Sequence, residues 1–527
     1  MSEGIVAAGH PRTAAAAAEI LADGGNAFDA VVAAHFAACV AEPVLASLGG
    51  GGFLLARTAR GERHLYDFFT QTPRRKRTEE EIDFRPILVD FGTATQEFHI
   101  GLGSMACPGS VKGLFRIRDE LGRLPMTRLV EPAVRLAREG VPLNALQAYI
   151  LDIVGGIYIA DPDVLEIFSA RRDPSRLVRH RERLRLPRLA DTLEVLAREG
   201  EALFYRGEIG QRLIADSRDR GGHLGPSDLS GYRVHRRRPL AIDYRGARIY
   251  TNPAPSAGGM LIAFGLRLLE AAGPLLGPFG SPGHLDRLVA AMEATSAARA
   301  EVEALADPAQ RSRELLGGTL LRRYRDAVVG RPACHRGTTH VSVLDAEGNE
   351  ASMTVSNGEG AGYAIPGTGI VMNNMLGEED LNPGGFHTWR HDMRMASMMA
   401  PTLLARGDGT DVVLGSGGSN RIRTAILQVL VNIVDFEMPV ARAVTRPRLH
   451  LENERLSVEP GFGDAGVAHL VGRYPEAQVW NERNLFFGGV HAVARDRRTG
   501  KLSGGGDPRR GGVCLRIVPE RGKGLRG

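Results

Sequence analysis

The chain has 527 residues, of which 43% are hydrophobic and 24% are charged, a composition ordinary for a globular protein with a large core. Its formal net charge of +5 arises from basic and acidic residues interleaved along the chain, which argues against a nucleic-acid partner. No run of about 18 apolar residues occurs and the N-terminal segment lacks a signal-peptide pattern, so we expect a cytoplasmic protein with no membrane span or membrane partner.

The first two thirds of the chain have mainly helical patterning, with a glycine-rich loop near the start. Hydrophobic spacing and helix-breaking residues predict helices over 12–22, 27–42 and 126–139, strands within 48–57 and over 64–69, and mostly helix over 190–330. Asn26 precedes the second helix and can cap its N-terminus. The four glycines at 49–52 predict a close approach of the backbone to the core or to a site. The polar segment 74–98 predicts no regular element.

The character of the sequence changes at residue 338, where strands and glycine-rich turns begin to dominate. The alternation of side chains predicts strands over 339–345, 350–356, 411–415, 489–495 and 513–518, and one helix over 421–435. The first two of these strands flank the polar turn "DAEGN", so we expect a hairpin. The chain therefore divides into a helix-rich part, 1–337, and a strand-rich part, 338–527.

Two threonines, Thr338 and Thr339, stand at this boundary, directly after the polar segment "RPACHRG". Threonine is common in strands because it is β-branched, so the pair alone does not predict a site. A threonine hydroxyl becomes a nucleophile when a base removes its proton, and cleavage of the preceding peptide bond would free an α-amino group for that task. Gly337 leaves this bond open to attack. The sequence therefore predicts cleavage between Gly337 and Thr338, and an inactive chain before it.

Acyl transfer to such a nucleophile also needs hydrogen-bond donors for the negative charge that develops on the attacked carbonyl oxygen. The segment "LGSGGSNRIR", residues 414–423, is a glycine-rich loop that leads into a predicted helix. Its backbone N–H groups and the helix dipole can supply that stabilisation. The pattern also fits an ordinary strand-to-helix turn, so the residues alone leave both interpretations open.

The threonine motif and four other segments resemble the γ-glutamyltransferase family of the N-terminal nucleophile hydrolases. They are, in the order of the family, "ILADGGNAFDAVVAAHFAACVAEPVLASLGGGGFLLAR", "TTHVSVLDAEGNEASMTVS", "GTGIVMNNM", "ASMMAPTLL" and "GSGGSNRIRTAILQVLVN". The resemblance implies a four-layer αββα sandwich, made as one precursor that cleaves itself into a large subunit, 1–337, and a small subunit, 338–527. It implies no cofactor and no metal, a small-molecule substrate, and a heterodimer that leaves a higher oligomer open.

The resemblance also assigns the catalytic residues. They are Thr338 as nucleophile and new N-terminus, Ser356 as the second hydroxyl residue that supports it, and Gly417 and Gly418 as oxyanion glycines, with Ser419 as the alternative if the alignment slides by one residue. The two neighbouring serines that border the substrate in the family become Ala396 and Ser397 here, so one of them is lost.

The substrate-binding residues depart from the pattern of the family. Phe69 stands where members that use glutathione carry an arginine that grips the glutamyl α-carboxylate, and a phenyl ring cannot make that bidentate contact. Glu378 is the implied partner of the substrate ammonium, with Asp380 as the alternative. Asn357 lies beside Gly358, which replaces an asparagine of the family. The catalytic groups are thus kept while the glutamyl clamp is changed.

Three functions are compatible with these residues. The first is a self-processing enzyme that hydrolyses or transfers a γ-glutamyl or related acyl group through an acyl-enzyme. The second is an enzyme with a non-glutamyl substrate, either an acylase like the cephalosporin acylases that the family resembles or a carbon–carbon bond hydrolase of a biosynthetic pathway. The third is an uncleaved scaffold, against which the retention of Thr338, Ser356 and the glycine loop argues.

His387 and His391 have helical metal-site spacing, but their segment lacks the glutamate of a zinc hydrolase, so we expect no metal.

Overall fold

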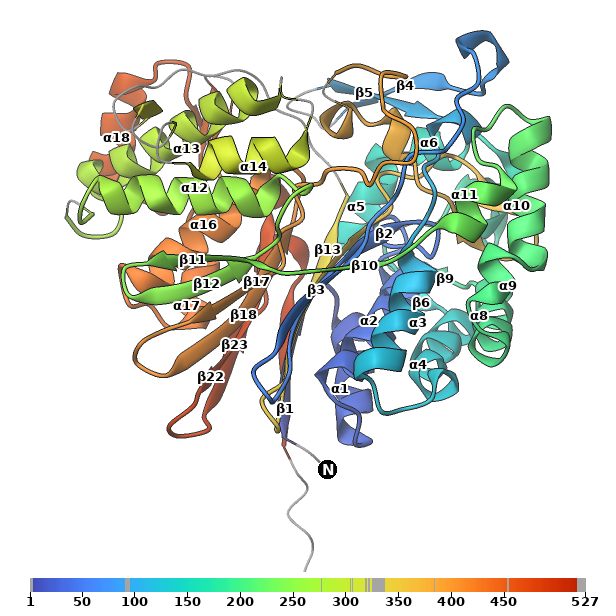
Figure 1. Ribbon diagram of the computed structural model, residues 1–527, viewed down its shortest axis with the longest axis horizontal. Coiled ribbons are helices and arrows are strands. Elements are labelled where there is room, and N and C mark those ends of the chain that lie inside the picture. Colours follow the sequence, from blue (N-terminus) through green and yellow to red (C-terminus); the bar gives the residue numbers. More distant parts are fainter. Residues whose placement is uncertain are drawn as a thin grey trace, which may run out of the picture.

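Two β-sheets pack face to face, and helices cover the outer face of each (Figure 1). The computed structural model describes residues 3–90, 95–275, 277–303, 305, 307–317, 320, 323–324, 337–382, 384–452 and 455–518. The predicted αββα sandwich is confirmed. Apolar side chains between the sheets form one continuous core with the helices behind the second sheet, and a second core lies between the first sheet and its helices.

The first sheet has seven strands, and each pair of neighbours is antiparallel. In spatial order they are β10 (His235–Arg237), β3 (Arg63–Phe68), β2 (Gly51–Arg57), β14 (Glu350–Ser356), β13 (Thr339–Asp345), β1 (Gly4–Ala8) and β24 (Val513–Ile517). Strands from before and after residue 338 therefore alternate across one sheet, and the two predicted parts of the chain are not separate domains.

The second sheet has six strands and is also antiparallel throughout. In spatial order they are β11 (Leu240–Tyr244), β12 (Ala247–Thr251), β17 (Thr402–Ala405), β18 (Thr410–Gly417), β22 (Gly489–Asp496) and β23 (Leu502–Gly505). Strands β13 and β14 of the first sheet pack against β18 and β22 of the second, so the centre of the sandwich is built mainly by residues after 338.

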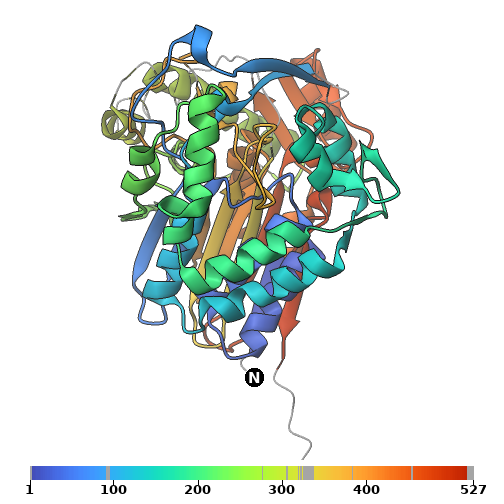
Figure 2. The ribbon, with the colours of Figure 1, turned by 90° about the vertical axis from the view of Figure 1, so that its right-hand side faces the viewer.

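Helices of the N-terminal half cover the first sheet, as Figure 2 shows. They include α1 (Pro11–Ala22), α2 (Ala27–Ala41), α3 (Ser110–Leu121) and α4 (Met126–Glu139). Asn26 caps α2 in a reciprocal capping box with Asp29, as the sequence predicts. The N-terminal N–H of Ala27 also donates to the carboxylate of Asp345 at 2.9 Å, which ties α2 to the end of β13. Every residue of α2 is buried, because its mostly small side chains allow close packing on all sides.

The helices over the second sheet are α12 (Gly258–Ala271), α16 (Arg421–Val434) and α17 (Val440–Thr445), with α13 (Pro282–Glu303) and α14 (Pro308–Leu316) packed on α12. The other longer elements are β4 (Arg85–Asp90), β5 (Thr95–Ile100), α5 (Ala145–Ile153), α6 (Gly155–Tyr158), α7 (Pro162–Phe168), α8 (Pro187–Glu199), α9 (Ala202–Tyr205), α10 (Glu208–Asp219), α11 (Pro226–Gly231), β19 (Leu449–Glu452), β20 (Arg455–Val458) and α18 (Asp464–Arg473).

Two expectations about elements were wrong. The segment expected to be irregular contains the β4–β5 hairpin, in which Val89, Phe98 and Ile100 are buried while Leu88 is exposed. These few buried residues stand among polar ones, so the segment shows no clear strand pattern. The stretch 190–330, expected to be mostly helical, contains β10, β11 and β12, because it crosses from the edge of one sheet to the edge of the other.

The glycine run at 49–52 brings three strand ends together. A Cβ atom on Gly50 would lie 2.3 Å from the carbonyl oxygen of Ser356, and one on Gly51 would lie 2.7 Å from that of Phe68. A side chain at either position would therefore collide with neighbouring backbone. The predicted close approach is confirmed, and it brings the end of β14 against the loop before β2.

Candidate active site

The ends of β13 and β14 place the predicted nucleophile and its supporting hydroxyl side by side. Thr338 directly precedes β13, Ser356 is the last residue of β14, and the antiparallel register pairs Thr339 with Val355. Both hydroxyl residues are nearly buried, with 5% of Thr338 and 8% of Ser356 exposed. The hairpin predicted from the sequence thus brings together two residues that lie 18 positions apart in the chain.

Both hydroxyls form hydrogen bonds with the peptide bond between Gly337 and Thr338. The Thr338 hydroxyl donates to the carbonyl oxygen of Gly337 at 2.8 Å, and the Ser356 hydroxyl donates to the same oxygen at 2.7 Å. The backbone N–H of Gly358 in turn donates to the Ser356 oxygen at 3.1 Å, which orients that hydroxyl. Two hydroxyl donors on one carbonyl oxygen polarise it, and the bond from Thr338 keeps its hydroxyl close to this carbonyl group.

The glycine loop after β18 lies on the other side of Thr338. A Cβ atom on Gly417 would lie 2.1 Å from the carbonyl oxygen of Thr338, so only glycine allows this contact. Gly418 has a φ of 121°, in the region that favours glycine, and it turns the chain toward α16. Ser419 lines the cavity in front of this loop, whereas Gly417 lies against Thr338 and Gly418 lies against Gly488 and Arg510. The role of Gly417 and Gly418 as oxyanion donors stays a prediction.

A buried arginine completes the surroundings of the nucleophile. The guanidinium of Arg510 donates to the carbonyl oxygen of Thr338 at 3.5 Å. Burial lowers the pKa of Arg510 to about 10, so it keeps its positive charge at neutral pH. No sequence pattern points to Arg510, because it belongs to the segment that joins β23 to β24 and reaches the site only in the folded chain.

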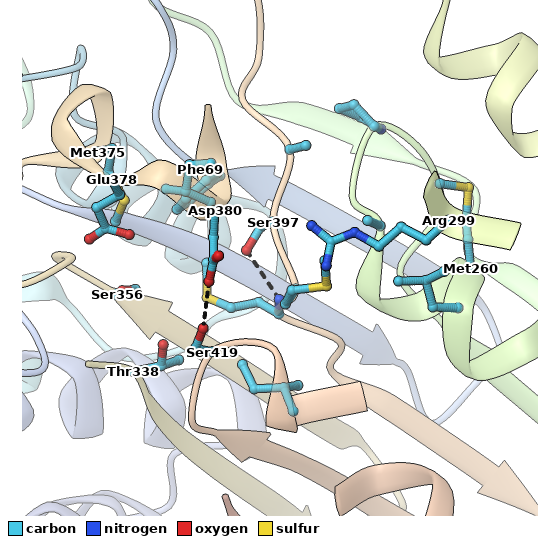
Figure 3. A pocket seen from close by; sticks show the side chains of 18 of the residues that line it. Phe69, Met260, Arg299, Thr338, Ser356, Met375, Glu378, Asp380, Ser397 and Ser419 are labelled. Atoms are coloured by element: carbon cyan, nitrogen blue, oxygen red, sulfur yellow. Dashed lines mark hydrogen bonds between the residues drawn. The ribbon is translucent and has the colours of Figure 1, made fainter. Parts of the chain in front are cut away.

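A cavity of about 890 Å³, open to solvent, lies in front of Gly337, Thr338 and Ser356 (Figure 3). Its walls are mostly apolar and include Phe69, Met260, Leu261, Met375, Met398 and Met399. Charged side chains also line it, with Glu378 and Arg299 on opposite sides (Figure 3). A mostly apolar lining with a few polar groups is typical of small-molecule sites.

Phe69 forms part of the cavity wall, as predicted, and is fixed from behind. Its ring stacks on Phe53 with centroids 5.6 Å apart, and its backbone carbonyl oxygen accepts a bond from the Tyr232 hydroxyl at 2.6 Å. Arg394 binds the same carbonyl oxygen and lies 3.4 Å from the carboxylate of Asp67. Arg394 is therefore engaged behind Phe69 and does not belong to the cavity lining.

The other predicted substrate residues differ in position. Glu378 and Ser397 line the cavity, and so does Asp380, whose carboxylate accepts a bond from the Ser419 hydroxyl at 3.1 Å. Asn357 is fully buried, its amide group reaches the carbonyl oxygen of Met372 at 3.5 Å, and it does not line the cavity. A substrate contact by Asn357 therefore stays a prediction that the described cavity does not support.

The pair His387 and His391 lies in a turn, not on a helix, which removes the helical spacing considered for a metal site. Within the described ranges, no three His, Cys, Asp or Glu side chains are grouped so that they could hold a metal ion. Among the described helices, none is both long and apolar enough to cross a bilayer.

An αββα sandwich with a threonine at the start of a central strand, its hydroxyl on the preceding carbonyl, defines the class of N-terminal nucleophile hydrolases. Comparison with known proteins is more specific. The family model of γ-glutamyltranspeptidase matches residues 13–517. The chain belongs to this family and is an enzyme, as the resemblance in the sequence implies.

Curated relatives and a crystal structure agree with this assignment. The glutathione hydrolase proenzyme of Escherichia coli is 29% identical over 500 residues, which cover 87% of this chain and 83% of the relative. The acylase ACY 1 proenzyme of Pseudomonas sp. strain SE83 is 30% identical over 490 residues, covering 90% and 87%. The structure of a cephalosporin acylase from Bacillus halodurans superposes with a TM-score of 0.84, at 26% identity, over 98% of this chain and 96% of that one.

Proposed function

We propose that this chain is a precursor that cleaves its own bond between Gly337 and Thr338. The products are a large subunit, 1–337, and a small subunit, 338–527, which stay together as a heterodimer. The observation that carries the proposal is the convergence of the Thr338 and Ser356 hydroxyls on the carbonyl oxygen of Gly337. A cytoplasmic location and a higher oligomer stay predictions.

The cleavage consists of an acyl shift followed by hydrolysis. The Thr338 oxygen attacks the carbonyl carbon of Gly337, the new carbon–oxygen bond forms, and the carbon–nitrogen bond breaks. The hydroxyl proton passes to the nitrogen, which becomes the α-amino group of Thr338. Water then hydrolyses the ester, which restores the Thr338 hydroxyl and leaves Gly337 as a carboxylate.

The same threonine then acts on the substrate. Its free amine, with a typical pKa of about 7.7–8.0, takes the hydroxyl proton as the oxygen attacks the donor carbonyl. It returns the proton to the leaving amine, and the acyl group stays on Thr338 as an ester. Water or an acceptor amine then removes the acyl group, so one intermediate serves both hydrolysis and transfer. Ser356, Gly417 and Gly418 are the groups proposed to support the charge on the attacked oxygen.

We infer that the preferred acyl donor lacks the α-carboxylate of a γ-glutamyl group. Phe69 presents an apolar wall where that carboxylate would bind, and Arg394 is engaged behind it. Glu378 and Arg299 lie on opposite sides of the cavity, whereas the ammonium and carboxylate of a glutamyl group share one carbon atom (Figure 3). These features favour acylase activity, of the kind named for two of the relatives, over glutathione hydrolysis. Carbon–carbon bond cleavage would use the same nucleophile and stays an alternative.

Mass spectrometry of the purified protein tests the proposal. We expect two chains, the smaller beginning at Thr338, and an acyl adduct on the smaller chain after brief incubation with an acyl anilide. The Thr338→Ala variant should remain one chain without an adduct. A small chain that begins at another residue, or cleavage of Thr338→Ala, would contradict the proposal.

A matched pair of anilides tests the substrate class. The γ-glutamyl and 4-aminobutanoyl p-nitroanilides differ only in the α-carboxylate. We expect the wild type to have the higher kcat/KM for the 4-aminobutanoyl compound, and a preference for the γ-glutamyl compound would overturn the inference.

A further inference from the structure

A buried glutamate that the mechanism above does not use holds the residue before the scissile bond. Glu359 follows Ser356 by three positions, and 2% of its surface is exposed. Its carboxylate accepts a hydrogen bond from the backbone N–H of Gly337 at 2.7 Å. A Cβ atom on Gly337 would lie 3.3 Å from the other oxygen of this carboxylate, so both carboxylate oxygens lie close to Gly337.

The position of Glu359 is itself fixed. Its backbone N–H donates to the side-chain oxygen of Asn374 at 2.9 Å, and the amide group of Asn374 donates to the carbonyl oxygen of His99 at 3.4 Å. The positive charge of Arg510 and the Tyr158 hydroxyl both interact electrostatically with the carboxylate. An anchored carboxylate is suited to accept the hydrogen bond from the Gly337 N–H.

Three groups therefore hold the two residues of the scissile bond before it is cut. Glu359 binds the N–H of Gly337, Ser356 binds the carbonyl oxygen of Gly337, and Arg510 binds the carbonyl oxygen of Thr338. Glycine is the most flexible residue in its backbone torsions, so the Gly337 carbonyl would otherwise rotate away from the Thr338 hydroxyl. A reacting pair held in an attack geometry reacts much faster than a mobile one.

We propose that Glu359 is the positioning residue of self-cleavage, which holds Gly337 for attack and then expels it once it is cut. Hydrolysis turns the carbonyl of Gly337 into a carboxylate, beside a group that Glu359 already binds. Two like charges in a buried site repel each other strongly. Gly337 also lines the cavity, so its departure enlarges the space in front of Thr338 for the acyl donor. This inference rests on the self-cleavage proposed above.

Pulse-chase synthesis of the full chain separates the two actions of Glu359. The variants are Glu359→Ala, which removes the acceptor, and Glu359→Gln, which keeps an acceptor oxygen and the volume but not the charge. Glu350→Gln is the matched control, because Glu350 is an equally buried acid at the far end of β14, paired with Arg57 at 2.7 Å. Loss of the precursor band gives the rate of cleavage. Thr338→Ala gives the uncut baseline, and thermal melting of each variant reports folding.

For cleavage, we expect Glu359→Ala to be slower than wild type by about tenfold or more, while Glu359→Gln and Glu350→Gln stay within about threefold. A wild-type rate in Glu359→Ala, or a rate in Glu359→Gln as low as in Glu359→Ala, would overturn the positioning role. If Glu359→Ala fails to fold, the proposal is still tested by the release measurement described next. That measurement then compares Glu359→Gln with the Glu350→Gln control. Failure of the wild type to cut would refute the proposed function instead.

For release, the protection of the Gly337 N–H is followed by hydrogen–deuterium exchange of peptides that contain Gly337, in both the uncut and the cut chains. We expect protection in uncut Thr338→Ala, its loss in cut wild type, and its retention in cut Glu359→Gln, where a neutral amide does not repel the new carboxylate. Retention should also lower kcat/KM of cut Glu359→Gln severalfold, because the end of the large chain stays in the cavity. Equal loss of protection in cut Glu359→Gln and wild type would overturn the expulsion.

Discussion

Arg394 and Phe69 occupy two sides of one wall: the phenyl ring lines the cavity, and the guanidinium binds the Phe69 carbonyl oxygen from behind. The pairing of Arg394 with Asp67, both buried, keeps the positive charge out of the acyl site. Arg394, which lies close to Ser397 in the sequence, is thus committed to structure. The substrate preference is therefore expected to depend on residue 69.

The Phe69→Arg variant is expected to gain activity on γ-glutamyl donors. Each restored charge-assisted hydrogen bond to the α-carboxylate is worth about 1.5–3 kcal/mol, which corresponds to about ten- to hundredfold in kcat/KM for γ-glutamyl p-nitroanilide. Phe69→Leu, which keeps the wall apolar, should show no gain. Self-cleavage of both variants verifies folding. Efficient glutathione hydrolysis by the wild type would contradict the prediction.

The Ser356→Ala variant is expected to slow self-cleavage by about a hundredfold, the usual effect of removing one donor to a developing oxyanion. The physical reason is the 2.7 Å bond from the Ser356 hydroxyl to the Gly337 carbonyl oxygen. Ser356→Thr keeps the hydroxyl and should process far faster than the alanine variant. Loss of the precursor band on gels measures both. Unchanged processing in Ser356→Ala would show that the hydroxyl does not act on this carbonyl.

Arg510 is expected to set the pH range of the mature enzyme. Its positive charge, close to Thr338, disfavours the ammonium form of the new N-terminus and so lowers the pKa of that amine. Arg510→Met should raise this pKa and move the acidic limb of the kcat/KM profile to higher pH by up to about one unit. The acidic limb of the Arg510→Lys variant should lie between those of the wild type and of Arg510→Met. The profile is measured with an acyl anilide, and an unshifted limb in Arg510→Met would refute the electrostatic role.

The buried carboxylate of Asp507 is expected to stabilise the fold in a pH-dependent way. Burial alone would raise the pKa of Asp507, but the charges of Arg448 at 2.7 Å and Arg509 at 3.1 Å outweigh it and lower the pKa. A lowered pKa in the folded state adds stability above the unfolded pKa, and this stability is lost as the pH falls through the folded value.

Asp507→Asn should therefore reduce the free energy of unfolding at pH 7 by about 3–5 kcal/mol, since it leaves two arginines without their shared partner. The difference in Tm from the wild type should narrow as the pH falls below the ordinary range of a carboxylate. Thermal melts of uncut Thr338→Ala, with and without the Asp507→Asn change, measure this in one continuous chain. A Tm difference between the two chains that stays constant down to low pH would contradict the stabilising role assigned to the Asp507 carboxylate.

Sequence patterns predicted the elements that have one buried face. The helix over 126–139 was predicted with its observed bounds, and so was the hairpin of β13 and β14. The pattern failed for β10, because this short edge strand is polar, and for β4 and β5, because their few buried residues, Val89, Phe98 and Ile100, stand among polar ones. Thr338 was predicted from the residues around it and Ser356 from the family resemblance, and the hairpin explains why these two strand ends meet.

Other site residues depend on packing that no local pattern records. Arg299 reaches the cavity from α13, and Arg510 reaches Thr338 from the loop before β24. Glu359 lies in an irregular segment just after β14, and its role depends on where the end of the large subunit lies. Such residues are identified by the partners that the fold gives them.

The alternation of strands across the first sheet determines the order of events in the life of the molecule. Strands β13 and β14 lie between β1 and β2, so the part of the chain after residue 338 has a backbone ladder to the part before it on each side. A chain that was cut before folding would leave two fragments with exposed strand edges, which are prone to aggregate. Folding must therefore come first and the cut second. A molecule that unfolds after the cut has lost the covalent connection that first brought these strands into register. Each molecule can therefore be activated only once.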